Sequence, residues 1–76
     1  MEQLSRISHD SEIMGGKACI KGTRVTVGMI LTLISEGNSP EELLKMYPYL
    51  QHDDIAQALQ YAAWTVDARE GVIISA

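Results

Sequence analysis

The sequence predicts a mainly α-helical domain that contains a helix-turn-helix and carries a short β-arm in front of it. Three observations predict this fold. Residues 39–63 read as a short helix, a proline-containing turn and a longer helix. Residues 27–36 are almost continuously apolar and lie between a threonine and a glycine, which suit the two ends of a helix. Residues 7–27 hold short apolar alternations broken by glycines, a pattern typical of small strands and tight turns.

The helix expected over residues 40–47 has the strongest start signal in the chain. Ser39 can accept a hydrogen bond from the backbone N–H three residues on, and Glu42 can reach back to the N–H of Ser39. Pro40 suits the first helical position, where no backbone donor is needed. Pro48 ends the helix, because proline lacks a donor and disfavours helical geometry in the residue before it.

The second helix of the motif is expected over residues 52–69. Apolar residues recur there at spacings of three and four, which predicts an apolar face made of Ile55, Leu59, Ala62, Ala63 and Val66. The residues that lie off this face are Asp54, Gln57, Gln60 and Tyr61. Gln51 is a poor N-cap, and the acidic residues after it compensate by ~0.3 to 1 kcal/mol through the helix dipole. Residues 70–76 are expected to form an apolar tail.

The helix expected over residues 27–36 has Thr26 as its N-cap and Gly37 as its C′ glycine. Before it, residues 7–27 form the β-arm. A turn at Lys21 and Gly22 joins two apolar pairs, Ala18 with Ile20 and Val25 with Val27, as in a hairpin. An isolated hairpin is marginal in water, so the arm is expected to pair with its copy in a second subunit. The dimer-arm residues are Ile20, Gly22, Thr23, Arg24, Val25 and Val27.

Length and composition favour a small oligomeric protein. The 76 residues are 46% apolar and 21% charged, which indicates a globular domain with a marginal core of its own and a surplus of apolar residues. We therefore expect a homodimer. Neither a signal sequence nor a stretch of about 20 apolar residues is present, which predicts a cytoplasmic protein without a membrane partner.

Cysteine and histidine usage gives no sign of enzyme or metal chemistry. Cys19 is alone, so it cannot form an internal disulfide, and it is expected to pack in the arm. His9 beside Asp10, and His52 before two aspartates, lack ligand or triad spacing and are interpreted as solvated surface. We expect no catalytic residues, no metal site and no cofactor, and a hydrolase is the weakest of the functions considered.

Charge argues against tight DNA binding by the second helix of the motif alone. Residues 37–76 carry two basic and six acidic residues, a net charge of −4, whereas residues 1–36 are neutral overall. Affinity for nucleic acid comes largely from neutralising phosphates. DNA contacts, if made, are expected from Arg6, Lys17, Lys21, Arg24, Gln51 and Gln57. For Arg24 two roles stay open: a contact to phosphate or partner, and the favoured one, a bond that holds the arm on the helical body.

Two sequence blocks resemble a known family. Residues 16–27 resemble the G-x-P-x-I-x-G-T-R-I/V-x-V signature of the bacterial domain-of-unknown-function 433 family, with Ala18 in the proline slot. The second block consists of Gly37, residues 39–43, Tyr47, Pro48, Leu50, Asp54, Ile55, Ala58, Leu59, Tyr61 and Ala62. Together the blocks cover roughly residues 7–66. The resemblance implies a dimeric, homeodomain-like three-helix domain, and an antitoxin that silences a PIN-like ribonuclease toxin.

The resemblance implies a type II antitoxin, and we expect it to bind its toxin through the end of the chain. The expected partner-binding residues are Trp64, Asp67, Arg69, Glu70, Val72, Ile73 and Ile74. Trp64 has a second possible role, because a chain without phenylalanine needs Tyr47 and Trp64 to fill its core. The alternative function is a stand-alone dimeric helix-turn-helix transcriptional regulator.

Overall fold

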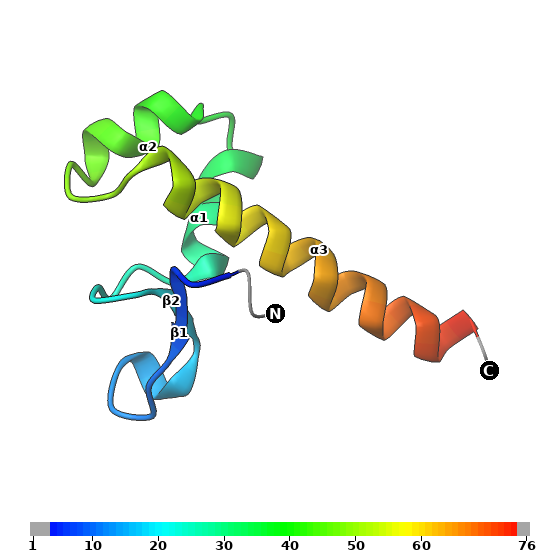
Figure 1. Ribbon diagram of the computed structural model, residues 1–76. Helices are drawn as coiled ribbons and strands as arrows, with labels where there is room; N and C mark the ends of the chain where they lie inside the picture. The colour runs from blue at the N-terminus through cyan, green and yellow to red at the C-terminus, as the bar shows by residue number, and fades with distance from the viewer. Residues whose placement is uncertain (1–3, 75–76) are drawn as a thin grey trace.

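The computed structural model of the chain describes residues 4–74, and the side chains of residues 4–69. It is a mainly helical domain with three helices and a two-stranded antiparallel sheet near its N-terminus (Figure 1). The elements in order are β1 (Ile7–His9), the 3₁₀ turn η1 (Met14–Gly16), β2 (Ala18–Ile20), α1 (Val27–Ser35), α2 (Pro40–Met46) and α3 (His52–Ile74). Within the described residues, no helix combines the length and the apolar character needed to cross a membrane.

The sheet pairs strands other than those expected from the sequence. β2 lies antiparallel to β1, with Ile7 opposite Ile20 and His9 opposite Ala18. Residues 25–27 add only an isolated bridge between Cys19 and Thr26. The expected turn is present, with Gly22 at a φ of +80°, but the chain after it enters the core and begins α1 instead of continuing as a strand.

α1 begins where the sequence predicts and ends at Ser35, one residue before its expected end. The Thr26 side chain accepts a hydrogen bond of 2.9 Å from the Met29 N–H. At the other end, Gly37 has a φ of +100°, and the N–H groups of Gly37 and Asn38 donate to the carbonyls of Ile34 and Leu33. This is a Schellman motif, which satisfies carbonyls that the helix leaves free.

α2 also confirms its predicted start. The Ser39 N–H donates to the Glu42 carboxylate at 2.7 Å, and the Glu42 N–H donates to the Ser39 hydroxyl at 3.2 Å. The backbone N–H of Ser39 and then its hydroxyl hold the pKa of Glu42 below its ordinary value of 4.5. This reciprocal capping box fixes the entry into the helix.

The lowered pKa of Glu42 predicts a pH dependence. A carboxyl with a depressed folded pKa stabilises the fold above its ordinary value, and this contribution is lost as the pH falls through the folded pKa. The stability advantage of the natural protein over Glu42→Gln should therefore be present at neutral pH and shrink below about pH 4.5. Urea unfolding of both proteins at pH 7 and pH 3 measures it, and an advantage that is equal at both pH values would contradict the assignment.

α3 buries only part of the face that its apolar spacing predicts: Ile55 is in the core and Ala62 packs against it, as expected. Its buried residues are Asp54, Ile55, Gln57 and Ala58. The exposed fractions of Leu59 and Val66, both expected on the buried face, are 42% and 50%. Asp54 and Gln57 tolerate burial because other parts of the chain bond to them. The helix also continues to Ile74, past its expected end at residue 69.

The β-arm belongs to the core of its own chain. The core cluster consists of Ile20, Val25, Val27, Ile30, Leu43, Leu50, Ile55 and Ala58. Three of these residues, Ile20, Val25 and Val27, were expected to form the dimer arm, but in this structure they are covered by their own helices. Cys19 is also buried, as predicted. The arm therefore needs no second subunit to be packed.

Candidate functional site

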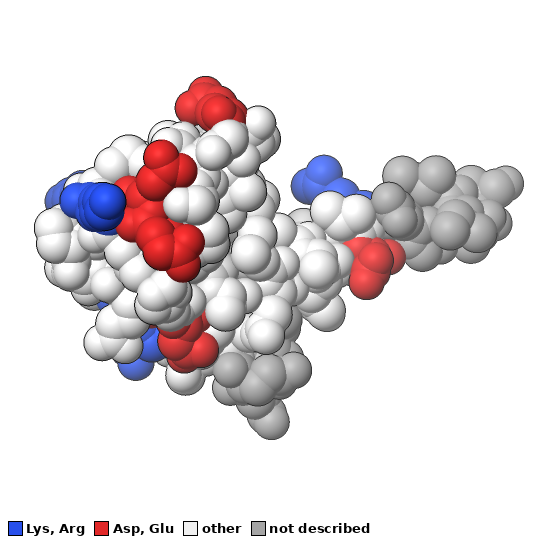
Figure 2. All heavy atoms as spheres, turned by 90° about the horizontal axis from the view of Figure 1, so that it is seen from above, with Lys and Arg blue, Asp and Glu red and all other residues white. Residues whose placement is uncertain are grey.

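The second half of α3 extends beyond the body of the domain (Figure 1). We call residues 59–74 the α3 extension, because Ala58 is the last fully buried residue among the described side chains of the helix. Along it, Leu59, Trp64 and Val66 have exposed fractions of 42%, 53% and 50%. Seen from the α2 side, acidic groups are spread over the body, while charges of both signs lie on the projecting helix (Figure 2). The extension thus presents large apolar side chains to solvent.

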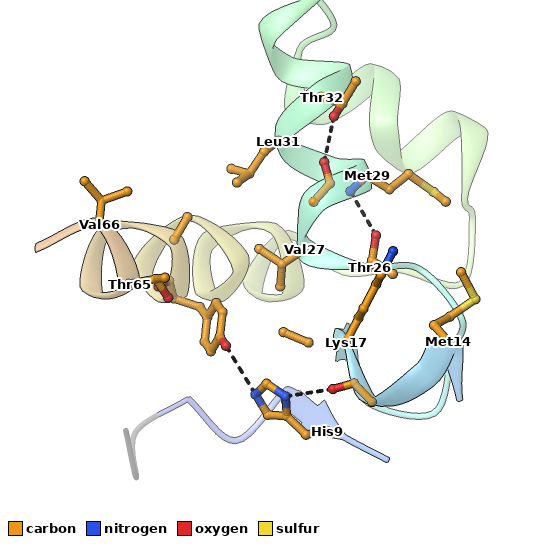
Figure 3. A pocket seen from close by; sticks show the side chains of 15 residues that line it. His9, Met14, Lys17, Thr26, Val27, Met29, Leu31, Thr32, Thr65 and Val66 are labelled. Atoms are coloured by element: carbon orange, nitrogen blue, oxygen red, sulfur yellow. Dashed lines mark hydrogen bonds between the residues drawn. The ribbon is translucent and has the colours of Figure 1, made fainter. Parts of the chain in front are cut away.

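An open apolar groove of about 800 Å³ runs beside the extension. Its walls are the β-arm, the first turns of α1 and the extension itself (Figure 3). Val27 and Leu31 line it from α1, and Ala62 and Val66 line it from α3. Met29 lies at the groove with its side chain partly exposed, and its sulfur accepts a hydrogen bond of 3.2 Å from the Tyr47 hydroxyl. Val66 belongs both to the groove and to the exposed surface of the extension, whereas Trp64 lines a separate hollow with Leu4, Ile7, His9 and Tyr61.

His9 ties the end of β1 to α3 at the edge of this groove. Its Nδ1 lies 3.2 Å from the carbonyl oxygen of Gly16, and its Nε2 lies 3.3 Å from the Tyr61 hydroxyl (Figure 3). Because a carbonyl only accepts, Nδ1 carries the proton when this bond forms, and neutral His9 then accepts from Tyr61. The pair orients Tyr61 against the arm. His9 was interpreted as solvated surface, and it is exposed but bonded at both nitrogens.

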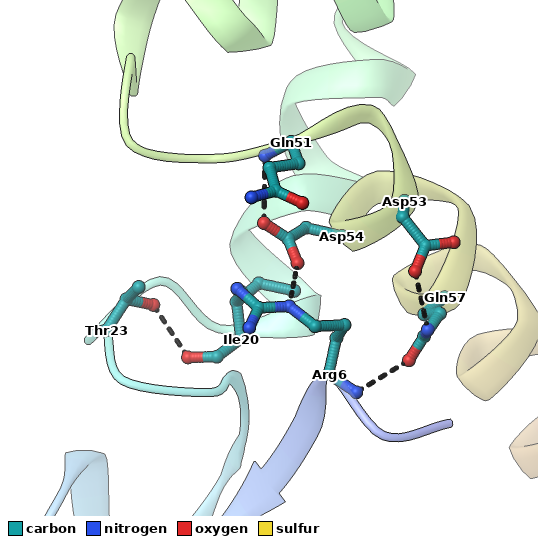
Figure 4. Close-up of polar contacts among 7 residues, drawn as sticks. All are labelled: Arg6, Ile20, Thr23, Gln51, Asp53, Asp54 and Gln57. Atoms are coloured by element: carbon teal, nitrogen blue, oxygen red, sulfur yellow. Dashed lines mark hydrogen bonds and ion pairs between the residues drawn. The ribbon is translucent and has the colours of Figure 1, made fainter. Parts of the chain in front are cut away.

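The polar centre of the domain is an ion pair between Arg6 and Asp54 (Figure 4). Arg6 Nε donates to Asp54 Oδ1 at 2.5 Å, and the other carboxylate oxygen accepts the Gln51 N–H at 2.8 Å. Asp54 is fully buried, whereas the Arg6 side chain is 34% exposed. The hydrogen bond to Asp54, and then the negative charge of Asp54, raise the pKa of Arg6. Asp54 therefore caps the start of α3 and attaches the N-terminal segment to it.

Gln57 completes this network. Its Oε1 accepts the Arg6 N–H at 2.7 Å, and its Nε2 donates to Asp53 Oδ2 at 2.9 Å (Figure 4). Gln57 is buried, so its amide is already committed within the chain and does not face a base edge. The interpretation of Asp54 as solvated surface was wrong. A sequence signal existed: an acidic residue three positions after the N-cap can accept the N-cap N–H.

Three of the four basic residues of the N-terminal half meet in a second hollow. We call it the basic hollow; its volume is about 490 Å³, and its lining residues are Arg6, Lys21, Gly22, Thr23, Arg24 and Tyr49. Lys17 lies elsewhere, at the apolar groove. The structure contradicts the favoured role of Arg24, which was a bond that holds the arm on the helical body. Arg24 is exposed and forms no ion pair within the described residues, and Arg6 holds the arm instead.

Only some of the expected partner-binding residues have side chains that the structure describes. Trp64, Asp67 and Arg69 are exposed on the extension, so Trp64 does not fill the core. Tyr61 and Tyr47 pack against the core in its place. The side chains of Glu70, Val72, Ile73 and Ile74 lie outside the described residues. Over the described part of the chain, no three His, Cys, Asp or Glu side chains are grouped so that they could hold a metal ion.

Comparison with known proteins identifies the family of the chain. Residues 7–62 match the family described as "Protein of unknown function (DUF433)". A crystal structure of a DUF433 member protein from Anabaena variabilis superposes with a TM-score of 0.78 at 27% sequence identity, covering 96% of this chain and 73% of that chain. None of the functionally curated proteins compared with the chain matches it. The family match spans most of the sequence, and the chain therefore belongs to the DUF433 family.

Proposed function

We propose that the chain is the antitoxin of a type II toxin–antitoxin pair, and that the α3 extension binds and neutralises a PIN-like ribonuclease. The observation that carries the proposal is the exposure of Leu59 and Trp64, which do not line the apolar groove, on a helix that has left the domain body. A helical segment of this length is marginal in water without tertiary packing. A partner that covers the extension would supply that packing.

The side chains of the extension suit a protein partner. Trp64 is the only tryptophan of the chain, and tryptophan is enriched among the residues that dominate binding energy. Asp67 and Arg69 lie further along the same helix and are exposed. An acidic group there complements the basic, RNA-binding face expected of a ribonuclease. Covering that face would keep the substrate out.

We further propose that α1, α2 and α3 form a homeodomain-like helix-turn-helix unit and that the protein is a homodimer. Residues 47–51 join α2 to α3 by a short connection, as in helix-turn-helix motifs. The dimer contact that we propose is the apolar groove, since the apolar residues of the β-arm are buried in their own core. Binding to the promoter of its own operon in the cytoplasm would make the antitoxin autoregulatory.

A second candidate is a stand-alone transcriptional regulator, favoured by the same helix order. The first turn of α3 argues against the usual insertion of that helix into the major groove. Asp53 is exposed there, and the amide of Gln57 is already bonded. A regulator would have to contact DNA through another surface.

Co-expression with the product of the adjacent open reading frame tests the proposed function. Size-exclusion chromatography with mass determination should show one complex of both proteins. The free chain should have about twice its monomer mass of 8.4 kDa. If the neighbour does not bind, the antitoxin proposal is wrong and the regulator becomes the better candidate. A free mass of 8.4 kDa would exclude the dimer.

A further inference from the structure

We propose that the basic hollow binds phosphate groups of duplex DNA. This inference rests on the operator-binding part of the proposed function, but not on toxin binding. The hollow brings together three cationic side chains, from the residue before β1 and from the turn after β2, and the exposed Tyr49. Tyr49 lies in the connection between α2 and α3. The hollow therefore adjoins the helix-turn-helix but avoids the acidic first turn of α3.

Arg6 is held in place for such a contact. Its Nε is bonded to the buried Asp54, which fixes the plane of the guanidinium group. Within the described residues, no hydrogen bond or ion pair uses its two Nη groups. A guanidinium presents a planar fork of donors that matches the oxygens of a phosphate. The ion pair with Asp54 therefore serves to position the fork at the hollow.

Lys21 and Arg24 lie on a turn that hydrogen bonds of Thr23 hold in place. The Thr23 hydroxyl donates to the Ile20 carbonyl at 2.8 Å and accepts the Val25 N–H at 3.0 Å. Gly22 supplies the positive φ that the turn requires. Neither Lys21 nor Arg24 forms an ion pair with another described residue, so both charges are free to neutralise a phosphate.

The set of side chains favours a nucleic acid backbone over an acidic protein. Arginine, lysine and tyrosine, here with a glycine turn, are the residue types that commonly contact phosphate oxygens. The hollow shares no lining residue with the apolar groove, so DNA and a protein on the extension could be bound at once. An antitoxin that represses its operon while bound to its toxin needs two such separate sites.

Fluorescence anisotropy of the isolated chain with a labelled 20-base-pair duplex, from 50 to 200 mM salt, tests this site. Lys21→Ala should weaken binding at 50 mM salt at least fivefold and reduce the slope of log K against log salt by about 0.9, the value for one phosphate contact. The Lys21→Ala/Arg24→Ala double variant should reduce the slope by about 1.8. Lys45→Ala is the matched control, because it removes the same charge from an exposed site on α2.

Three outcomes would overturn the proposal. The first is equal weakening by Lys21→Ala and Lys45→Ala, which would indicate a general charge effect. The second is a natural chain that shows no measurable binding to DNA, or that binds a single-stranded RNA more tightly than the duplex. The third is a poly-glutamate peptide that binds at Lys21 and Arg24 when DNA does not.

Tyr49→Ala gives a second test of the basic hollow, and it should weaken DNA binding at least threefold. Because no toxin is present, failure here is distinguishable from failure of the antitoxin proposal.

Discussion

Asp54→Ala is expected to lower the free energy of unfolding by about 2–4 kcal/mol, which is a large part of the stability of a small domain. The substitution removes the partner of Arg6 and leaves the Gln51 N–H at the start of α3 without its acceptor. Asp54 accepts two hydrogen bonds, from Arg6 and from Gln51, and a hydrogen bond to a charged group contributes about 1.5–3 kcal/mol. Thermal unfolding should show a melting temperature about 10–20 °C lower.

The control for this substitution is Asp67→Ala. It removes the same carboxylate from the same helix, at an exposed position with no hydrogen bond or ion pair to another described residue. A surface change of this kind is expected to alter stability by less than about 0.5 kcal/mol. Equal melting temperatures for the two variants would mean that the Arg6–Asp54 pair does not hold the N-terminal segment on α3.

Trp64→Ala is expected to weaken binding to the proposed ribonuclease partner at least 30-fold, because truncating a central aromatic residue of an interface costs about 2 kcal/mol or more. The melting temperature of the free chain should change little, since more than half of the Trp64 side chain is exposed. Isothermal titration calorimetry with the purified partner measures the affinity. The two readouts together separate a binding role from a structural one.

Met46→Ala is the matched control for Trp64→Ala. Met46 is a large, exposed apolar residue at the end of α2, and it lines neither the apolar groove nor the basic hollow. Its substitution should leave the affinity within about twofold. If Met46→Ala weakens binding as much as Trp64→Ala does, the partner contacts the body of the domain and not the extension.

The parts of the fold that depend on neighbouring residues could be predicted from the sequence. Thr26, Ser39 with Glu42, and Gly37 each act within a few residues, and all of them have the predicted bonds or backbone angle. The strand partner of β2 could not be predicted in this way. Ile7 pairs with Ile20 across a loop, whereas the nearer residues 25–27 looked equally suited to a strand.

The buried face of α3 was predicted correctly only in part, because burial there also depends on residues far away in the sequence. Apolar spacing counts Leu59 and Val66 as buried, and it counts Asp54 and Gln57 as exposed. The N-terminal segment reverses this result, because Arg6 supplies partners to both polar residues from 48 and 51 positions away. Polar groups are buried when they are bonded, and such a partner has no periodic signature.

The sequence predicted the kinds of residue that form the candidate sites, but not which of these residues lie together. The basic residues of the arm were expected to offer cations, and the structure separates Lys17 from the other three. Tyr49 gave no signal in the sequence that would connect it to Lys21 and Arg24. Trp64 had two possible roles; its exposure excludes the core role, and partner binding stays a prediction.

Hydrogen exchange of the backbone amides tests the central claim most directly, namely that the α3 extension is the partner-binding element. The exchange of residues 59–74 should be measured in the free chain and in the complex with the product of the adjacent open reading frame. We predict that the extension exchanges at least tenfold more slowly in the complex, while α2 changes little. A complex that forms without slowing the extension, or that protects α2 instead, would contradict the account.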